Sequence, residues 1–146
     1  MFGVSVANQQ ESVELDYQRL KAAARAVLEG EGVKKSKITL AFMTDEAIHA
    51  LNRRFLQHDE PTDVITFPYS SAKAASLEGE IAISTETASR AAEERGHSVA
   101  DELVLYVIHG VLHLCGFDDV EEPERTTMRQ KERQYLRQLE IEIEGV

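Results

Sequence analysis

The sequence has one cysteine, three prolines and no long apolar run. A single cysteine cannot form a disulfide within the chain, which is typical of proteins from a reducing compartment. The longest strongly apolar stretch, residues 103–115, contains two histidines and is shorter than the roughly 20 residues that cross a bilayer. The first residues, MFGVSVANQQE, lack the basic and apolar regions of a secretory signal. These absences predict a cytoplasmic protein with no membrane partner.

Positive charge is also scarce, because 16 lysines and arginines stand against 26 acidic residues, a net charge of −10. This balance argues against a protein that coats nucleic acid without selectivity, because neutralising phosphates requires concentrated lysine and arginine. The charge is uneven along the chain. Residues 19–37 hold six basic and two acidic side chains, whereas residues 118–146 hold five basic and nine acidic ones. We interpret both segments as solvated helix faces.

The chain, with 146 residues and 42% apolar side chains, is long enough for one domain with a sizeable core. Apolar side chains spaced three and four residues apart predict helices, and short runs rich in β-branched residues predict strands. The expected order is helix, strand, helix, two strands and three helices, over residues 13–30, 38–43, 45–56, 63–69, 79–84, 85–95, 98–114 and 123–139. The expected fold class is therefore α+β (mixed α/β), with a small mixed sheet flanked by about five helices in a single domain, residues 1–146.

Individual positions in these helices give further expectations. Val13 begins the apolar stripe of the first helix, and Phe55 belongs to the apolar stripe of the second. Thr85 can cap the third helix with its hydroxyl group. His49 and His97 have no apparent partner in the sequence, so both are expected on the surface.

The segment HGVLHLCGFDD has the strongest chemical signal in the chain. His109 and His113 are four residues apart on one helix face, so they can direct two imidazoles to one point. Gly116 can turn the chain after the helix because glycine tolerates positive φ, and the turn brings Asp119 toward the same point. Two imidazoles, one carboxylate and an open position are the elements of a catalytic zinc site. Asp118 is the alternative third ligand if the turn is one residue shorter.

The helix that contains both histidines, residues 98–114, is apolar on nearly all sides. We therefore expect it to be a buried central helix with the metal site at its end. The same histidine spacing occurs in zinc peptidases of the HExxH type, in which a glutamate after the first histidine is the general base. Gly110 occupies that position here. A metallopeptidase would need its base from elsewhere, which makes it the weaker alternative.

Three blocks of sequence resemble the YbeY family of metal-dependent single-strand endoribonucleases. They are HGVLHLCGFDD, the upstream LNRRFLQHDEPTDVITFP at residues 51–68, and GEIAIS at residues 79–84. Met128 and Glu132 also fit the last helix of that family. The resemblance implies a zinc ion held at the pattern H-x3-H-x5-H and single-stranded RNA as the substrate. It further implies a role in ribosomal RNA maturation and ribosome quality control, in contact with the ribosome or its associated proteins.

Two positions depart from the family pattern. Asp119 replaces the third histidine, and a carboxylate ligand is expected to keep the metal while raising the pKa of its bound water. Leu56 replaces an arginine that could bind phosphate and stabilise the charge that develops during phosphodiester cleavage. Arg53, Arg54 and His58 are close in sequence and are candidates for this cationic role, although such side chains are also common on solvated helix faces and loops.

The residues and the resemblance together predict a zinc-dependent endoribonuclease with one Zn²⁺ per chain, bound by His109, His113 and Asp119. The expected partners are single-stranded RNA, in particular ribosomal RNA, and the ribosome, without DNA. A different class of protein is suggested by Leu56: a ribosome-associated binding protein that keeps a structural metal and has lost efficient catalysis.

Overall fold

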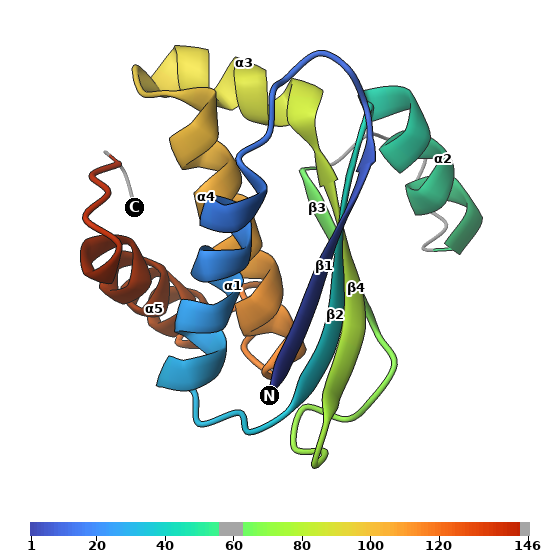
Figure 1. Ribbon diagram of the computed structural model, residues 1–146. Coiled ribbons are helices and arrows are strands. Elements are labelled where there is room, and N and C mark those ends of the chain that lie inside the picture. Colours follow the sequence, from blue (N-terminus) through green and yellow to red (C-terminus); the bar gives the residue numbers. More distant parts are fainter. Residues whose placement is uncertain (56–62, 144–146) are drawn as a thin grey trace.

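A computed structural model describes residues 1–55 and 63–143 of the chain. Within these ranges four strands form one sheet and five helices surround it (Figure 1). The strands are β1 (Phe2–Gln9), β2 (Ser36–Met43), β3 (Val64–Pro68) and β4 (Leu77–Ser84). The helices are α1 (Tyr17–Gly30), α2 (Asp45–Phe55), α3 (Thr85–Arg95), α4 (Val99–Leu114) and α5 (Glu124–Gln138). The predicted α+β class is confirmed.

The sheet is mixed, with the strand order β1-β2-β4-β3. β2 lies parallel to both of its neighbours, β1 and β4, whereas β3 pairs with β4 in the antiparallel direction. In that last pair Val64 lies opposite Ile83 and Pro68 lies opposite Gly79. Residues 69–76 connect these two antiparallel neighbours, so β3 and β4 form a hairpin with a long connection.

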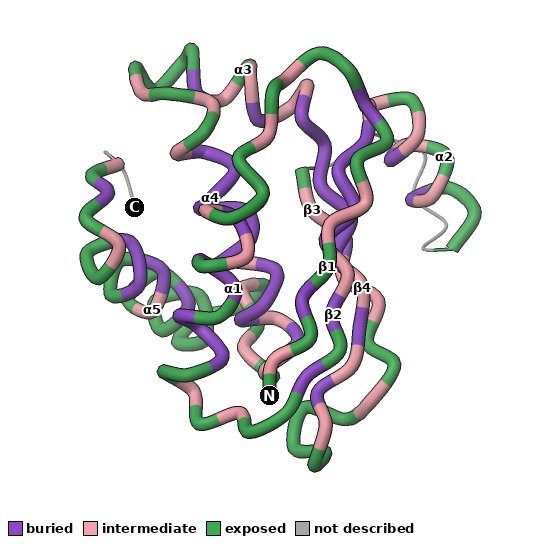
Figure 2. Tube along the Cα trace, viewed as in Figure 1, coloured by how far each residue is buried: buried purple, intermediate pink, exposed green. Residues whose placement is uncertain are grey.

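The two faces of the sheet are covered unequally. α1 and α4 lie on one face with α5 beyond them, and α2 lies on the other face (Figure 1). Alternate side chains of β2 enter two cores: Ile38, Leu40 and Phe42 enter the larger one, and Ala41 and Met43 enter the smaller one beside α2. The tube coloured by burial shows the same difference, with continuous buried segments in the sheet and α4 and mixed colours in α2 (Figure 2).

α4 is the central helix of the larger core, and 11 of its 16 residues are buried. Ser98 caps its first turn by accepting a hydrogen bond from the N–H of Asp101 at 3.1 Å. Gly116, with φ of 102°, reverses the chain after the last turn. Although α4 is apolar, neither it nor any other described helix has the length and hydropathy of a membrane span.

β1 is a strand that the sequence analysis did not predict. Its apolar side chains alternate with small and polar ones, but only Val4 is buried, while Phe2 and Val6 are half-buried. β1 lies at the edge of the sheet and pairs only with β2 among the described strands. An edge strand of this kind gives a weak period-two signal, because one of its faces is only partly covered.

Three predicted details of the helices were wrong. Val13 packs against the core from the loop before α1 and is not part of that helix. Ser84 caps α3, and Thr85 is instead the first residue of the helix. Phe55 is 56% exposed, and its ring meets the Phe67 ring edge-on, with centroids 5.9 Å apart.

Candidate metal centre

The last turns of α4 and the loop after it bring together three side chains that could bind a metal ion. Nε2 of His109 lies 3.1 Å from Nε2 of His113 and 3.4 Å from Oδ2 of Asp119, and Nε2 of His113 lies 3.5 Å from Oδ1 of Asp119. Tetrahedral zinc with bonds of about 2.0–2.1 Å to nitrogen and oxygen has ligand atoms about 3.3 Å apart. The three separations are close to that value, so these donors fit an ion of this size.

The three donors are accessible from outside the protein. The side chains of His109, His113 and Asp119 are 19%, 24% and 32% exposed, respectively. Asp118 is more exposed, and its carboxylate accepts a hydrogen bond from the N–H of Asp119 at 2.7 Å. The geometry therefore favours Asp119 over Asp118 as the third donor, and each of the three side chains is partly exposed to solvent.

Glu132 of α5 supports this group from behind. Its side chain is fully buried, and Oε2 lies 2.5 Å from Nδ1 of His109. Its other oxygen accepts a hydrogen bond from Nη1 of Arg129 at 3.0 Å. The carboxylate accepts the proton of Nδ1, which leaves the lone pair of Nε2 directed toward the other two donors. Carboxylates in this position orient metal-binding histidines and increase their basicity.

The position of Glu132 in the sequence gave no role for it beyond its fit to a family helix. The signal that could have found one was a single acid in an otherwise apolar stripe, next to Met128 and Leu136 on the buried side of α5. A buried carboxylate needs a partner, because burial without one is strongly unfavourable. The pattern predicts that a partner exists, but only the packing of α5 on α4 shows that it is His109.

The two imidazoles have pKa values shifted in opposite directions. Burial disfavours the charged form of His109, but the hydrogen bond and charge of Glu132 outweigh this effect and raise the pKa of His109. Burial and the neighbouring His109 both lower the pKa of His113. His113 is therefore neutral at neutral pH, as a metal ligand must be, whereas a metal at His109 competes with a proton as the pH falls.

The helix position after His109 cannot supply the base of an HExxH peptidase. A Cβ atom at Gly110 would lie 2.6 Å from Cγ2 of Ile81 on β4, so any larger side chain would push the helix off the sheet. The nearby carboxylate of Asp63, just before β3, is close enough for its charge to raise the pKa of His109.

The predicted cationic candidates lie apart from this arrangement or outside the described residues. Arg53 and Arg54 are exposed on the last turn of α2, which lies across the sheet from α4 (Figure 1). The guanidinium of Arg54 lies over the ring of Phe55, 5.2 Å from its centroid. His58 and Leu56 lie outside the described residues.

The predicted surface position of His97 was wrong. Its side chain is only 9% exposed, and its Nε2 lies 2.5 Å from Oε1 of the fully buried Glu102. Nη1 of Arg95 lies 3.4 Å from the other oxygen of Glu102. The tight turn at Gly96, which has φ of 76°, joins α3 to α4 and folds the imidazole inward.

Comparison with known proteins gives the family of this chain. The profile of the family described as Endoribonuclease YbeY matches residues 5–140. The chain belongs to the YbeY endoribonuclease family. Endoribonuclease YbeY of Carboxydothermus hydrogenoformans is 38% identical over 94% of this chain and 97% of its own length. The same identity and shares are found with Endoribonuclease YbeY of Pelotomaculum thermopropionicum.

The fold is also similar to that of a solved structure. A Thermotoga maritima protein studied in solution superposes with a TM-score of 0.65 and covers 95% of this chain and 89% of its own. Its sequence is 24% identical, so this likeness concerns the fold alone. The resemblance to the YbeY family, found in three blocks of sequence, is confirmed by the family profile and the curated relatives.

Proposed function

We propose that this member of the YbeY family is a zinc-dependent endoribonuclease that hydrolyses single-stranded RNA in the cytoplasm, with ribosomal RNA as its substrate. The observation that carries the proposal is the group of three donor atoms on His109, His113 and Asp119, all within 4.8 Å of one another. The names of the curated relatives support the reaction class. We propose one zinc ion per chain, in a single domain.

Each residue of the site has a defined task in this proposal. When bound, zinc lowers the pKa of a coordinated water to about 7 and polarises a phosphoryl oxygen. His109, His113 and Asp119 hold it, and Glu132 fixes the proton of His109 on Nδ1 so that Nε2 is free to bind. The charge of Asp119 opposes ionisation of the water, which shifts the reaction toward higher pH than three neutral ligands would.

The proposal extends to the ribosome as a partner and to ribosome quality control as the setting. Its support is the resemblance of the three sequence blocks to the family. DNA is not proposed as a substrate, since the net charge of −10 disfavours general binding to duplex phosphates.

Cleavage of paired and unpaired RNA of the same sequence tests the proposed function. The protein is stripped with a chelator, reloaded with zinc, and assayed on an RNA strand alone and on its duplex. We expect cleavage of the single strand, loss of cleavage after chelation, and recovery with zinc. His113→Ala should not recover. Cleavage that is insensitive to the chelator would contradict the metal mechanism.

A second candidate function follows from Leu56, where the family has an arginine. A ribosome-associated binding protein with a structural metal would bind zinc tightly, lose stability on chelation and cleave no RNA. Leu56→Arg separates the two functions. If the protein is an enzyme that lacks only this cation, Leu56→Arg should raise the rate of RNA cleavage by roughly 100- to 1000-fold. This is the change in rate found when a single stabilising donor is removed from an enzyme site. A stable, zinc-loaded variant with no gain in rate would favour the binding protein or a cation already supplied by another residue, for which His58 is the sequence candidate.

A further inference from the structure

The net charge of the C-terminal segment conceals a basic helix. All five basic side chains of residues 118–146 lie between positions 125 and 137, inside α5. Only one of the nine acidic side chains, Glu132, lies between positions 125 and 138. This stretch has five basic residues and one acidic one, and Glu132 is fully buried against His109. Glu124, the first residue of α5, is the one exposed acid of this helix, so the surface of α5 is positive in a chain whose net charge is −10.

Four of these basic side chains form what we call the arginine row. They recur at every fourth position along α5 and are all exposed: Arg125, Arg129, Arg133 and Arg137. Residues four apart lie on one side of a helix, with about 6 Å between successive positions. The row runs beside the buried stripe that packs on α4, so it follows the junction between α5 and the body of the protein.

One member of the arginine row is linked to the candidate metal centre through Glu132. Nη1 of Arg129 lies 3.0 Å from Oε1 of Glu132, whose other oxygen contacts His109. Arg133 and Arg137 lie one and two helical turns further on, and neither forms an ion pair with a carboxylate of the described residues. The Nε of Arg133 donates only to the carbonyl oxygen of Arg129, at 3.4 Å. Two guanidinium groups thus stay available for an anion from outside.

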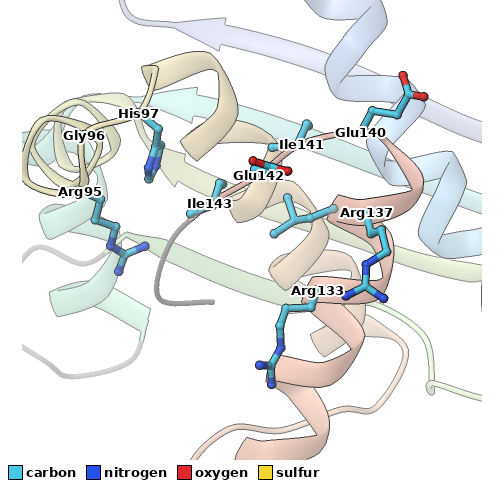
Figure 3. A pocket seen from close by; sticks show the side chains of 10 residues that line it. Arg95, Gly96, His97, Arg133, Arg137, Glu140, Ile141, Glu142 and Ile143 are labelled. Atoms are coloured by element: carbon cyan, nitrogen blue, oxygen red, sulfur yellow. The ribbon is translucent and has the colours of Figure 1, made fainter.

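The row ends at a pocket of about 940 Å³ (Figure 3). Arg133 and Arg137 line it from α5, and Arg95 and His97 line it from the turn between α3 and α4. Figure 3 shows Arg95 on one side of the pocket and the two α5 arginines on the other.

Two further features of the pocket concern charge and hydrogen bonding. The carboxylate of Glu140 points away from the three guanidinium groups, and Glu142 is the other acid that lines the pocket (Figure 3). Nδ1 of His97 is buried and has no hydrogen-bond partner among the described residues. The volume falls within the roughly 300–1,000 Å³ of small-ligand pockets, which is enough room for a nucleotide.

We propose that the arginine row and this pocket bind the phosphodiester backbone of the RNA on one side of the cleaved bond. This inference rests on the proposed function. The guanidinium group of an arginine can donate two hydrogen bonds to one phosphate group. Guanidinium groups at regular spacing therefore suit the regularly spaced phosphates of an RNA strand. The regular spacing of the four arginines favours the RNA strand over an acidic protein, and Arg129 places the row next to Glu132, the carboxylate that contacts His109.

The test compares two double variants that each remove two positive charges. Arg133→Gln/Arg137→Gln removes the part of the row that lines the pocket. The control, Arg25→Gln/Lys34→Gln, removes two exposed cations from the basic segment of residues 19–37. The zinc-loaded proteins are titrated with a single-stranded RNA whose phosphorothioate linkages resist cleavage, at several salt concentrations. Melting temperatures show that each variant is folded.

Each lost phosphate contact lowers the slope of log affinity against log salt by about 0.7 for a single strand. We therefore expect the row variant to lose about 1.4 from the slope and to bind roughly 25-fold more weakly at 0.1 M salt, with a much smaller change in the control. Arg133→Lys/Arg137→Lys should retain most of the slope. On cleavable RNA the row variant should raise KM with little change in kcat, and a trinucleotide too short to reach the pocket should be unaffected.

An equal loss of RNA affinity in the row variant and in the control would overturn the proposal, because it would show a general effect of net charge. An unchanged slope in the row variant would also overturn it, as would an unchanged RNA affinity together with lost binding to an acidic ribosomal protein. The proposed function fails separately, if unmodified RNA is not cleaved by the wild type. The binding comparison does not depend on cleavage, so the two failures are distinguishable.

Discussion

Two pairs of glutamate and histidine lie at opposite ends of α4 and look alike. At the N-terminal end Glu102 lies 2.5 Å from His97, and at the C-terminal end Glu132 lies 2.5 Å from His109. Both glutamates are fully buried, and each also contacts an arginine through its second oxygen. The pairs differ in what surrounds the free nitrogen of the imidazole. Among the residues that the structure describes, the pair at His109 alone is part of a group that could hold a metal ion.

The difference shows what distinguishes a buried ion pair from a group that could hold a metal ion. Nε2 of His109 faces two further donors, His113 one helical turn away and Asp119 beyond the turn at Gly116. Nδ1 of His97 is buried with no partner among the described residues. A buried glutamate fixes the orientation of an imidazole in both places, but chelation requires the second and third donors.

The largest expected effect is a loss of zinc on substitution at the C-terminal end of α4 but not at its N-terminal end. His113→Ala or His109→Ala should leave the protein without stoichiometric zinc and reduce metal-dependent cleavage to background, because each removes one of three ligands. His97→Ala should retain zinc at the wild-type level. Metal analysis after desalting measures both. Stoichiometric zinc retained by both His109→Ala and His113→Ala would refute the ligand assignment.

Changing the two glutamates sharpens the comparison. Glu132→Gln should weaken zinc binding by about 10- to 100-fold, because the amide orients His109 but no longer increases its basicity. Glu102→Gln should leave zinc affinity unchanged. Competition with a chromophoric chelator gives both affinities. Equal effects of the two substitutions would mean that burial of charge in general, and not support of a ligand, explains the loss.

The middle of α4 determines how closely both ends are held to the sheet. Gly110→Ala should destabilise the fold by about 1–3 kcal/mol, because the new Cβ atom overlaps Ile81 of β4. Urea unfolding measures the change. The double variant Gly110→Ala/Ile81→Ala should be more stable than the sum of the single effects, since residues in contact are not additive. Strict additivity would show that the two side chains do not compete for the same space.

The smallest expected effect concerns the identity of one ligand. Asp119→His should retain zinc and shift the pH profile of cleavage downward, because a neutral imidazole replaces a charge that opposes ionisation of the bound water. The pH dependence of kcat/KM measures the shift. Asp118→Ala serves as the control and should change neither zinc content nor the profile. Loss of zinc in the control would move the third ligand by one residue.

Much of the fold could be predicted because it is encoded locally. For example, α4 is predicted by the spacing of its apolar residues, by the capping residue Ser98 before it and by Gly116 after it. β1 was missed because an edge strand needs little burial, so its apolar alternation is faint. The inward position of His97 was missed for another reason, because a turn between two helices decides it.

The candidate site shows the same division. His109 and His113 are one helical turn apart, and Asp119 follows a glycine turn, so their sequence spacing alone predicts a cluster. Glu132 is 23 residues from His109, and their contact depends on the packing of two helices. No local pattern gives that distance. The interpretation of the C-terminal segment as an ordinary solvated face also used only its net charge, which hides the basic surface of α5.

The central claim is that the three-donor site binds the metal that cleaves RNA. Its most direct test is a zinc titration of chelator-stripped wild-type protein, with bound zinc and the initial rate of single-stranded RNA cleavage measured in the same samples. We expect the rate to rise in proportion to bound zinc and to level off at one ion per chain, whereas His109→Ala neither binds the ion nor gains activity. A rate that is independent of bound zinc, or one that rises equally in His109→Ala, would contradict the account.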